Sequence, residues 1–135
     1  MNEFTNPLPE LTRVSKPFYR AARQHKLLIQ RCKDCKKNIF YPKSVCPHCL
    51  SIDLEWFESS GKGKLYTYTI AKAGAPEAFA GAVPYVIGVI DLKEGVRMLS
   101  WIVDCGHERI KCDMDVEVTF KDINDEVALP MFRPV

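Results

Sequence analysis

The chain has 135 residues and a mass of 15.4 kDa, with 47% hydrophobic and 27% charged residues. This composition excludes a wholly disordered chain, and the best apolar run, residues 83–90, is too short to span a membrane. The formal net charge is only +2, although residues 1–50 hold ten basic and three acidic residues. Because the sequence has six cysteines and no recognisable signal peptide, it predicts a cytoplasmic protein whose cysteines stay reduced.

The first segment, residues 1–26, is predicted to form a loose arm followed by one short helix. The arm, residues 1–13, is polar and contains two prolines. Ser15 suits a helix N-cap, and Pro17 suits the first helical turn. Apolar residues at roughly helical spacing then indicate a helix over about 17–25. So short a helix is not stable alone and must pack on the rest of the chain or on a partner.

The second segment, residues 27–58, holds four cysteines in two C-x-x-C pairs, with strands predicted at 27–30 and 54–58. Each pair turns the backbone so that both sulfurs face one point, and a hairpin can bring the two pairs together. The sequence therefore predicts a closed, structural zinc site, with iron, free thiols or a redox disulfide as alternatives. The predicted ligands are Cys32, Cys35, Cys46 and Cys49.

Basic side chains close to these cysteines can offset the negative charge of four thiolates around one divalent ion and can donate to the sulfurs. They explain part of the N-terminal basic excess without any partner. These side chains are Arg31, Lys33, Lys36 and Lys37. His48 lies inside the second pair, but we expect it to point outward because four cysteines already complete the site.

The third segment, residues 59–135, is predicted to be all β. Strands are expected where apolar and β-branched residues alternate between turns, at 65–72, 85–92, 97–104, 116–122 and 127–132. Five short strands favour a small Greek-key barrel of the OB type, with a sandwich fragment as the alternative. The predicted architecture is therefore mostly β: a short helix, a zinc ribbon and an OB-fold barrel.

Three local features of this third segment are also predicted. Gly88 indicates a bulge or bend in the second strand, and a small-residue loop is expected at 74–81. Strict alternation in the first strand places one set of side chains on a common face. That set is Leu65, Thr67, Thr69 and Ala71.

The remaining two cysteines, Cys105 and Cys112, flank a predicted loop and are interpreted as ordinary thiols. His107 lies in the same loop, so a Cys–His nucleophile is the alternative. The sequence contains no phosphate-binding glycine loop, nucleophile elbow or metalloprotease helix. It therefore predicts no catalytic residue.

Five motifs in a fixed order resemble one family over residues 15–134. They are the two C-x-x-C pairs, S-G-x-G at 60–63, P-Y at 84–85, E-G-V-R at 94–97 and L-P-x-F-R-P at 129–134. The chain resembles the bacterial and archaeal small proteins in which a rubredoxin-like zinc ribbon precedes an OB fold, long labelled a domain of unknown function. That family often has glycine where this chain has His25 and Lys36.

The resemblance implies a non-catalytic accessory subunit of an acyl-CoA-processing complex. Family members act beside thiolase-fold enzymes or related aldolases, hydratases and acyltransferases. In such assemblies the small protein stabilises the catalytic partner and can help to hold the CoA moiety, while the catalytic residues belong to the partner. The partners expected for this chain are accordingly such an enzyme and CoA or acyl-CoA, with no membrane.

Four residues of the ribbon are candidate contacts for that partner or for the CoA phosphates. Arg31 and Lys43 are the basic candidates, with a solvated surface as the alternative. Phe40 and Tyr41 are the aromatic candidates, with packing inside the ribbon as the alternative.

Two other function classes compete with the accessory subunit. Zinc ribbons and OB folds commonly bind nucleic acid, but residues 85–92 carry no basic side chain and residues 51–135 hold fourteen acidic residues against nine basic ones. Electron transfer through a bound iron is the other alternative.

Overall fold

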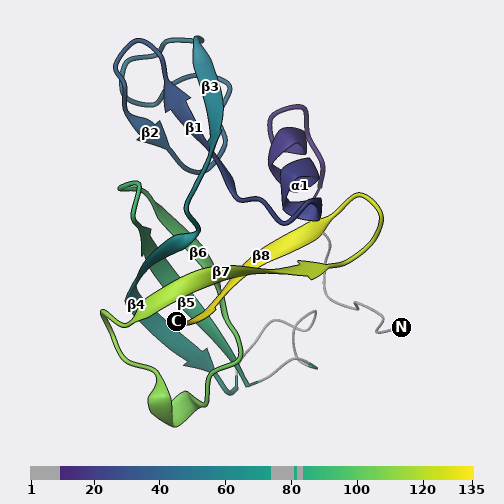
Figure 1. Cartoon of the computed structure of the whole chain (residues 1–135), viewed down its shortest axis with the longest axis vertical. Coiled ribbons are helices and arrows are strands. Elements are labelled where there is room, and N and C mark those ends of the chain that lie inside the picture. Colours follow the sequence, from purple (N-terminus) through teal and green to yellow (C-terminus); the bar gives the residue numbers. More distant parts are fainter. Residues whose placement is uncertain (1–9, 74–80, 82–83) are drawn as a thin grey trace.

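The computed structural model describes residues 10–73, 81 and 84–135. One helix, α1 (Lys16–Arg23), precedes a small three-stranded sheet made of β1 (Leu28–Cys32), β2 (Asn38–Ile39) and β3 (Leu54–Glu58). The barrel strands follow as β4 (Lys62–Ala71), β5 (Tyr85–Leu92), β6 (Arg97–Ile102), β7 (Asp115–Asp122) and β8 (Ala128–Pro134). Figure 1 shows the small sheet at one end of the molecule, the barrel at the other and α1 beside β8. The predicted loop at 74–81, apart from residue 81, and residues 1–9 of the predicted arm lie outside the described residues.

The five barrel strands close in the order β4-β5-β6-β8-β7. Antiparallel pairs join most neighbours, β4 and β7 included, whereas β6 and β8 run parallel and pair at Ile102 and Phe132. This closed five-stranded barrel with one parallel contact confirms the predicted OB fold. The small sheet, in the order β2-β1-β3, is antiparallel throughout and forms what we call the ribbon, residues 27–58.

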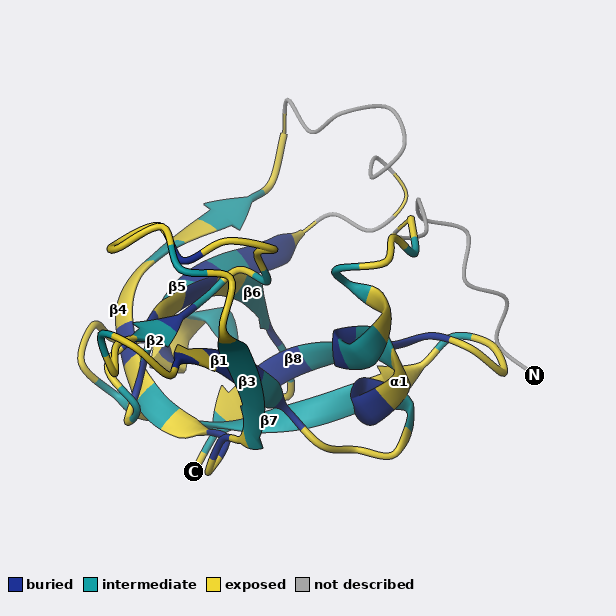
Figure 2. Cartoon of the chain, turned by 90° about the horizontal axis from the view of Figure 1, so that it is seen from above, coloured by how far each residue is buried: buried dark blue, intermediate teal, exposed yellow. Residues whose placement is uncertain are grey.

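One apolar core runs through the barrel and continues into the ribbon and the helix. Phe132 at its centre is fully buried, and Phe18 of α1 and Leu27 and Ile29 of the ribbon belong to the same cluster. In Figure 2 buried residues lie along β5 and β8 and on one side of α1, whereas the ribbon loops are largely exposed. The ribbon is therefore joined to the barrel by packing as well as by the chain.

Helix α1 packs on the chain itself, although its start differs from the prediction. Ser15 does not cap a helical amide; its hydroxyl accepts a hydrogen bond of 2.9 Å from the backbone N–H of Thr12. Ser15 is the N-cap residue by position, as predicted, and Pro17 lies in the first turn, but the Ser15 hydroxyl closes the preceding turn and makes no capping hydrogen bond. At the other end Arg23 donates to the carbonyl oxygen of Asn124 at 2.8 Å and pairs with Asp122 at 3.2 Å. The helix is thereby fixed to the turn between β7 and β8.

Strand β4 breaks the predicted alternation. Its register with β5 shifts between Leu65 and Thr67, and this bulge reverses which side chains face inward. Leu65 is fully buried, but after the bulge Tyr68 and Ile70 pack against the core in place of the predicted threonines. The prediction that residues 65, 67, 69 and 71 share one face is therefore wrong.

Of the bulge or bend predicted at Gly88, the bulge is not found there, because β5 keeps a regular register and the shift lies in the facing strand β4. Gly88 is required for space: a Cβ at this position would lie 2.7 Å from Leu65 Cδ1 and 3.0 Å from Ile102 Cδ1. Gly61 has a positive φ of 73°, which glycine adopts without strain. The S-G-x-G step is thus dictated by the tight entry into β4.

Candidate metal centre and the ribbon–barrel junction

The ribbon brings its four paired cysteines together. The sulfurs of Cys32, Cys35, Cys46 and Cys49 all lie within 4.8 Å of one another. The Cys32 and Cys49 sulfurs are 3.5 Å apart, and those of Cys35 and Cys46 are 3.7 Å apart. Four sulfurs ~2.3 Å from one tetrahedral zinc ion lie ~3.8 Å from each other. The sulfurs are therefore spaced as one tetrahedral ion requires, and the cluster can hold a metal.

The two cysteine pairs have the same local geometry. In the first, the N–H of Lys36 donates to the Cys32 carbonyl oxygen at 2.9 Å; in the second, the N–H of Leu50 donates to the Cys46 carbonyl oxygen at 2.9 Å. Lys36 and Leu50 both have a positive φ, 67° and 65°. Each pair is thus a tight turn that ends in a left-handed residue, a conformation that glycine adopts without strain.

Backbone amides supply the hydrogen bonds that reach the sulfurs. The N–H of Cys35 lies 3.4 Å from Cys32 Sγ, and the N–H of His48 lies 3.3 Å from Cys46 Sγ. The His48 residue itself is exposed and, as expected, does not belong to the sulfur cluster. Lys33 pairs with Asp53 at 3.8 Å, and none of the described lysines makes a hydrogen bond to a sulfur. The predicted donation from lysine side chains to the sulfurs is therefore not found among the described residues.

The charges of the four sulfurs also favour a cation. The N–H of Cys35 and other hydrogen bonds lower the pKa of the Cys32 thiol to about 7. The N–H of Ser51 favours the Cys49 thiolate, yet the neighbouring sulfurs and burial raise the pKa of Cys49 to about 12. The thiolate of one cysteine thus suppresses ionisation of the next, and a divalent cation removes this repulsion. The donor set fits a soft, tetrahedral ion such as zinc.

A second cluster of polar contacts lies where the ribbon meets the barrel. Glu94, in the turn between β5 and β6, accepts hydrogen bonds from the Ser59 hydroxyl at 2.6 Å and the Ser60 N–H at 3.0 Å. Its carbonyl oxygen accepts one from the Asn38 side chain of β2 at 2.8 Å. Burial raises the pKa of Glu94, but the bonds from Ser59 and Ser60 outweigh it, so this pKa lies below its ordinary value. Glu94 therefore joins the ribbon, the linker and the barrel.

The four predicted contact residues differ in their exposure and in the contacts that they make within the chain. Phe40 is half-buried and packs edge-on against Phe18 at 5.7 Å, within the core. Tyr41 is 48% exposed, and its hydroxyl accepts a hydrogen bond of 2.9 Å from the Leu99 N–H of β6. Arg31 and Lys43 are exposed on the ribbon. Their proposed contacts with a partner or with CoA stay predictions.

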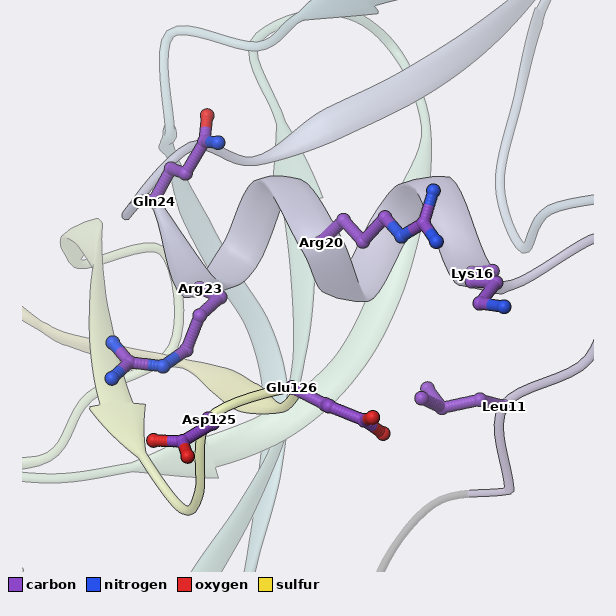
Figure 3. A pocket seen from close by; sticks show the side chains of 7 residues that line it. All are labelled: Leu11, Lys16, Arg20, Arg23, Gln24, Asp125 and Glu126. Atoms are coloured by element: carbon purple, nitrogen blue, oxygen red, sulfur yellow. The ribbon is translucent and has the colours of Figure 1, made fainter.

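Hollows in the described surface are lined in part by residues that were not predicted from the sequence to belong to a site. A cavity of about 520 Å³ at the junction is lined by Phe40 together with Lys37, His48, Glu94 and Arg97 among others. Another of about 260 Å³, drawn in Figure 3, lies between α1 and the turn before β8. Lys16 and Arg20 line its helix side, and Asp125 and Glu126 line its loop side. Arg23 also lines the hollow and pairs with Asp122, so basic and acidic side chains face one another across it.

Comparisons with known proteins agree with this architecture. The chain matches two family models: "ChsH2, rubredoxin-like zinc ribbon domain" over residues 20–55 and "ChsH2, C-terminal OB-fold domain" over residues 56–121. A solved structure described as "Ltp2-ChsH2(DUF35) aldolase" superimposes with a TM-score of 0.83 at 35% identity, covering 94% of this chain and 98% of that one. The class of protein is therefore a rubredoxin-like zinc ribbon joined to an OB fold.

Curated relatives extend the match. A DUF35 domain-containing scaffold protein of Methanocaldococcus jannaschii is 40% identical over 97 residues, covering 71% of this chain and 68% of the relative. A probable enoyl-CoA hydratase alpha subunit of Thermomonospora curvata is 35% identical over 128 residues; this covers 95% of this chain but only 40% of that protein. A benzoylsuccinyl-CoA thiolase subunit of Thauera aromatica is 33% identical over 98 residues, covering 70% of this chain and 63% of the relative. The chain belongs to the ChsH2-type DUF35 family.

Proposed function

We propose that this protein is a non-catalytic accessory subunit that acts in the cytoplasm beside an acyl-CoA enzyme of the thiolase, aldolase, hydratase or acyltransferase type. The observation that carries the proposal is the full-length likeness to the chain of the Ltp2-ChsH2(DUF35) aldolase structure. Relatives named as scaffold proteins and as subunits of CoA enzymes give the same direction. No described helix is both long and apolar enough to cross a membrane.

We propose zinc as the metal of the ribbon, held by the two cysteine pairs. Four thiolates leave no open coordination position, so the ion would organise structure and would not activate water or substrate. The ribbon's separate apolar cluster is small, with Cys32, Ile39 and Cys46 as its buried members, whereas Leu27 and Ile29 pack into the barrel core. Metal binding would therefore supply much of the folding energy around the cysteines. Iron in the same site is the alternative, and metal analysis of the purified protein distinguishes the two.

The loop after β6 supports the absence of catalysis by this chain. The Cys105 thiol donates to the carbonyl oxygen of Gly106 at 3.4 Å, and no hydrogen bond to His107 is found in the described part of the chain. Cys112 is exposed. A nucleophile needs a base within hydrogen-bond reach, and neither thiol has one here.

The test is co-expression of the full chain with a candidate acyl-CoA enzyme subunit from the same organism, followed by affinity purification and size-exclusion chromatography. We expect the two chains to elute together and the enzyme subunit to be less soluble when expressed alone. If both chains are stable and elute separately at micromolar concentration, the proposal fails.

A direct role in holding CoA is the finer part of the proposal. Arg31 and Lys43 are exposed basic residues. The Lys43 backbone is fixed because its N–H donates to Gln30 Oε1 at 2.7 Å and its carbonyl oxygen accepts from Gln30 Nε2 at 2.8 Å. Calorimetric titration of the assembled complex with CoA should show weaker binding for Arg31→Glu and Lys43→Glu. Unchanged CoA binding by both variants would contradict a direct role of this chain in holding CoA.

A further inference from the structure

The outside of β5 and β6 is apolar where the outside of a barrel is ordinarily polar. Cross-strand pairing joins Ile87 to Trp101 and Val89 to Leu99. Because successive side chains alternate between faces, and the intervening Val86, Ile90, Met98 and Ile102 belong to the core, these four point away from it. Leu99 is exposed, and the other three are half-buried. We call this set the outer apolar face: Ile87, Val89, Leu99 and Trp101.

Strand β7 of the same barrel shows that the fold does not require such a face. Its inward residues are Val116, Val118 and Phe120, which are buried or pack against the core. Its alternate, outward positions are occupied by Asp115, Glu117, Thr119 and Lys121. The apolar character of the outer apolar face is therefore a property of β5 and β6, and an aliphatic side chain such as Leu99 gains nothing from being 54% exposed.

Residues at the border of the face are of the kinds that dominate protein interfaces. Tyr66 of β4 is 47% exposed, and the Arg97 guanidinium lies 3.8 Å above its ring. Tyr41 of the ribbon extends the border from the other side through its bond from the Leu99 N–H. Tyrosine, tryptophan and arginine are enriched among the residues that carry most of the binding energy at interfaces. The face thus has an apolar centre and an aromatic border.

Charge decides what can bind there. The outward positions of the described β5 and β6 strands include one cation, Arg97, and one anion, Asp91, and these pair with each other at 2.5 Å. The face has no unpaired cation with which to bind the phosphates of nucleic acid or CoA. It is complementary to a neutral, apolar protein surface with a polar margin.

We propose that the outer apolar face is the surface that docks the acyl-CoA enzyme subunit, with Leu99 and Trp101 at its centre. This inference rests on the proposed function, and it adds the surface and the chemistry of the contact. The competing surface is the tip of the ribbon, where Leu50 and Ile52 are more exposed, at 77% and 82%. That tip is narrow and bordered by charge, because Asp34 accepts from Ser51 nearby and Lys33 pairs with Asp53.

The test compares charge substitutions on the two surfaces in the full chain. Leu99→Glu is placed at the centre of the face and Ile52→Glu at the ribbon tip, and both positions are exposed enough to accept a carboxylate without disturbing the core. Affinity for the purified enzyme subunit is measured by biolayer interferometry, and folding by circular dichroism and metal content. We expect Leu99→Glu to weaken binding by about a hundredfold and Ile52→Glu by less than about threefold.

A milder pair of variants controls for misfolding. Leu99→Ala should weaken binding by about tenfold, and Leu99→Met should keep it, because methionine preserves the apolar contact. If the wild-type chain binds no acyl-CoA enzyme subunit, the proposed function fails. If the wild type binds, Leu99→Glu binds equally well and Ile52→Glu does not, the docking surface is the ribbon tip and this inference alone is overturned.

Discussion

The ribbon and the barrel are stabilised by different means. The barrel closes around a core of fully buried side chains such as Leu65, Ile90, Val116 and Phe132, so hydrophobic burial suffices. The smaller cluster of the ribbon consists mainly of two buried cysteines and Ile39, with Cys35 and Leu54 beside them. A segment of this size buries too little surface to fold alone, so we expect its order to depend on the metal and on packing against the barrel. On this proposal one short chain combines a metal-dependent part with a metal-independent one.

The largest effect is expected from a substitution that removes a metal ligand of the ribbon. Cys46→Ser removes a fully buried ligand, and structural zinc sites contribute on the order of 10 kcal/mol to the folding of small metal-binding peptides. We expect the variant to lose its metal and the amide protection of β1 to β3, while β4 to β8 stay protected in hydrogen exchange. The exposed Cys112→Ser is the matched control and should change neither. Loss of barrel protection in Cys46→Ser would show that the two parts are not separable.

The complementary substitution, which disturbs the barrel and leaves the ribbon intact, is at Phe132. Phe132→Ala removes a fully buried ring at the centre of the core and should lower the free energy of unfolding by about 3–5 kcal/mol. At low temperature the folded variant should still hold one metal ion per chain, which elemental analysis measures alongside denaturation with urea. A loss of metal before any unfolding would contradict the separation of the two parts.

A smaller effect is expected at the junction. Glu94→Gln weakens the hydrogen bonds from Ser59 and Ser60 and should cost about 1–2 kcal/mol at neutral pH. Because the folded pKa of Glu94 lies below its ordinary value, the ionised carboxylate contributes stability above that ordinary value, and this contribution disappears as the pH falls through the folded pKa. The difference in stability between wild type and Glu94→Gln, measured by urea denaturation from pH 7 to pH 3, should therefore shrink with falling pH. A difference that stays constant over this range would contradict the role of the Glu94 charge.

The smallest effects are expected at turn residues that have a positive φ. Lys36→Gly and His25→Gly place glycine where φ is 67° and 61°. Glycine relieves the strain of a left-handed backbone but increases the entropy of the unfolded chain. We therefore expect the free energy of unfolding, measured by thermal denaturation, to rise by no more than about 1 kcal/mol. Lys37→Gly, at a neighbouring exposed position without a positive φ, should be destabilising instead. Equal effects at residues 36 and 37 would contradict this account.

Motifs with fixed chemistry were predictable from the sequence. The spacing of the two cysteine pairs indicates where they turn. The apolar run at 85–92 and the turn after it predict strands at 85–92 and 97–104, which the structure has at Tyr85–Leu92 and Arg97–Ile102. Local propensity failed where distant contacts decide. The bulge after Leu65 arises from barrel closure and reverses the faces of β4, and Ser15 bonds backward to Thr12, not forward into the helix.

The junction and the outer apolar face illustrate the same limit. Glu94 reads as a turn residue in the sequence, and its contacts with Asn38 and Ser59 appear only once the ribbon lies against the barrel. Tyr41 and Leu99 are separated by 58 residues and meet through one hydrogen bond. The apolar run at 85–90 predicts a buried strand. It does not show that alternate residues face outward, because their orientation depends on which side of the sheet is covered.

The central claim is that this chain supports catalysis by another protein and performs none itself. The most direct measurement is acyl-CoA turnover by the purified enzyme subunit that co-purifies with this chain, assayed alone, with the metal-loaded chain added, and with Cys46→Ser added. We predict no turnover by the chain alone and a gain in the partner's activity and half-life that wild type supplies and Cys46→Ser does not. Turnover by the isolated chain, or a partner equally active and stable without it, would contradict the account.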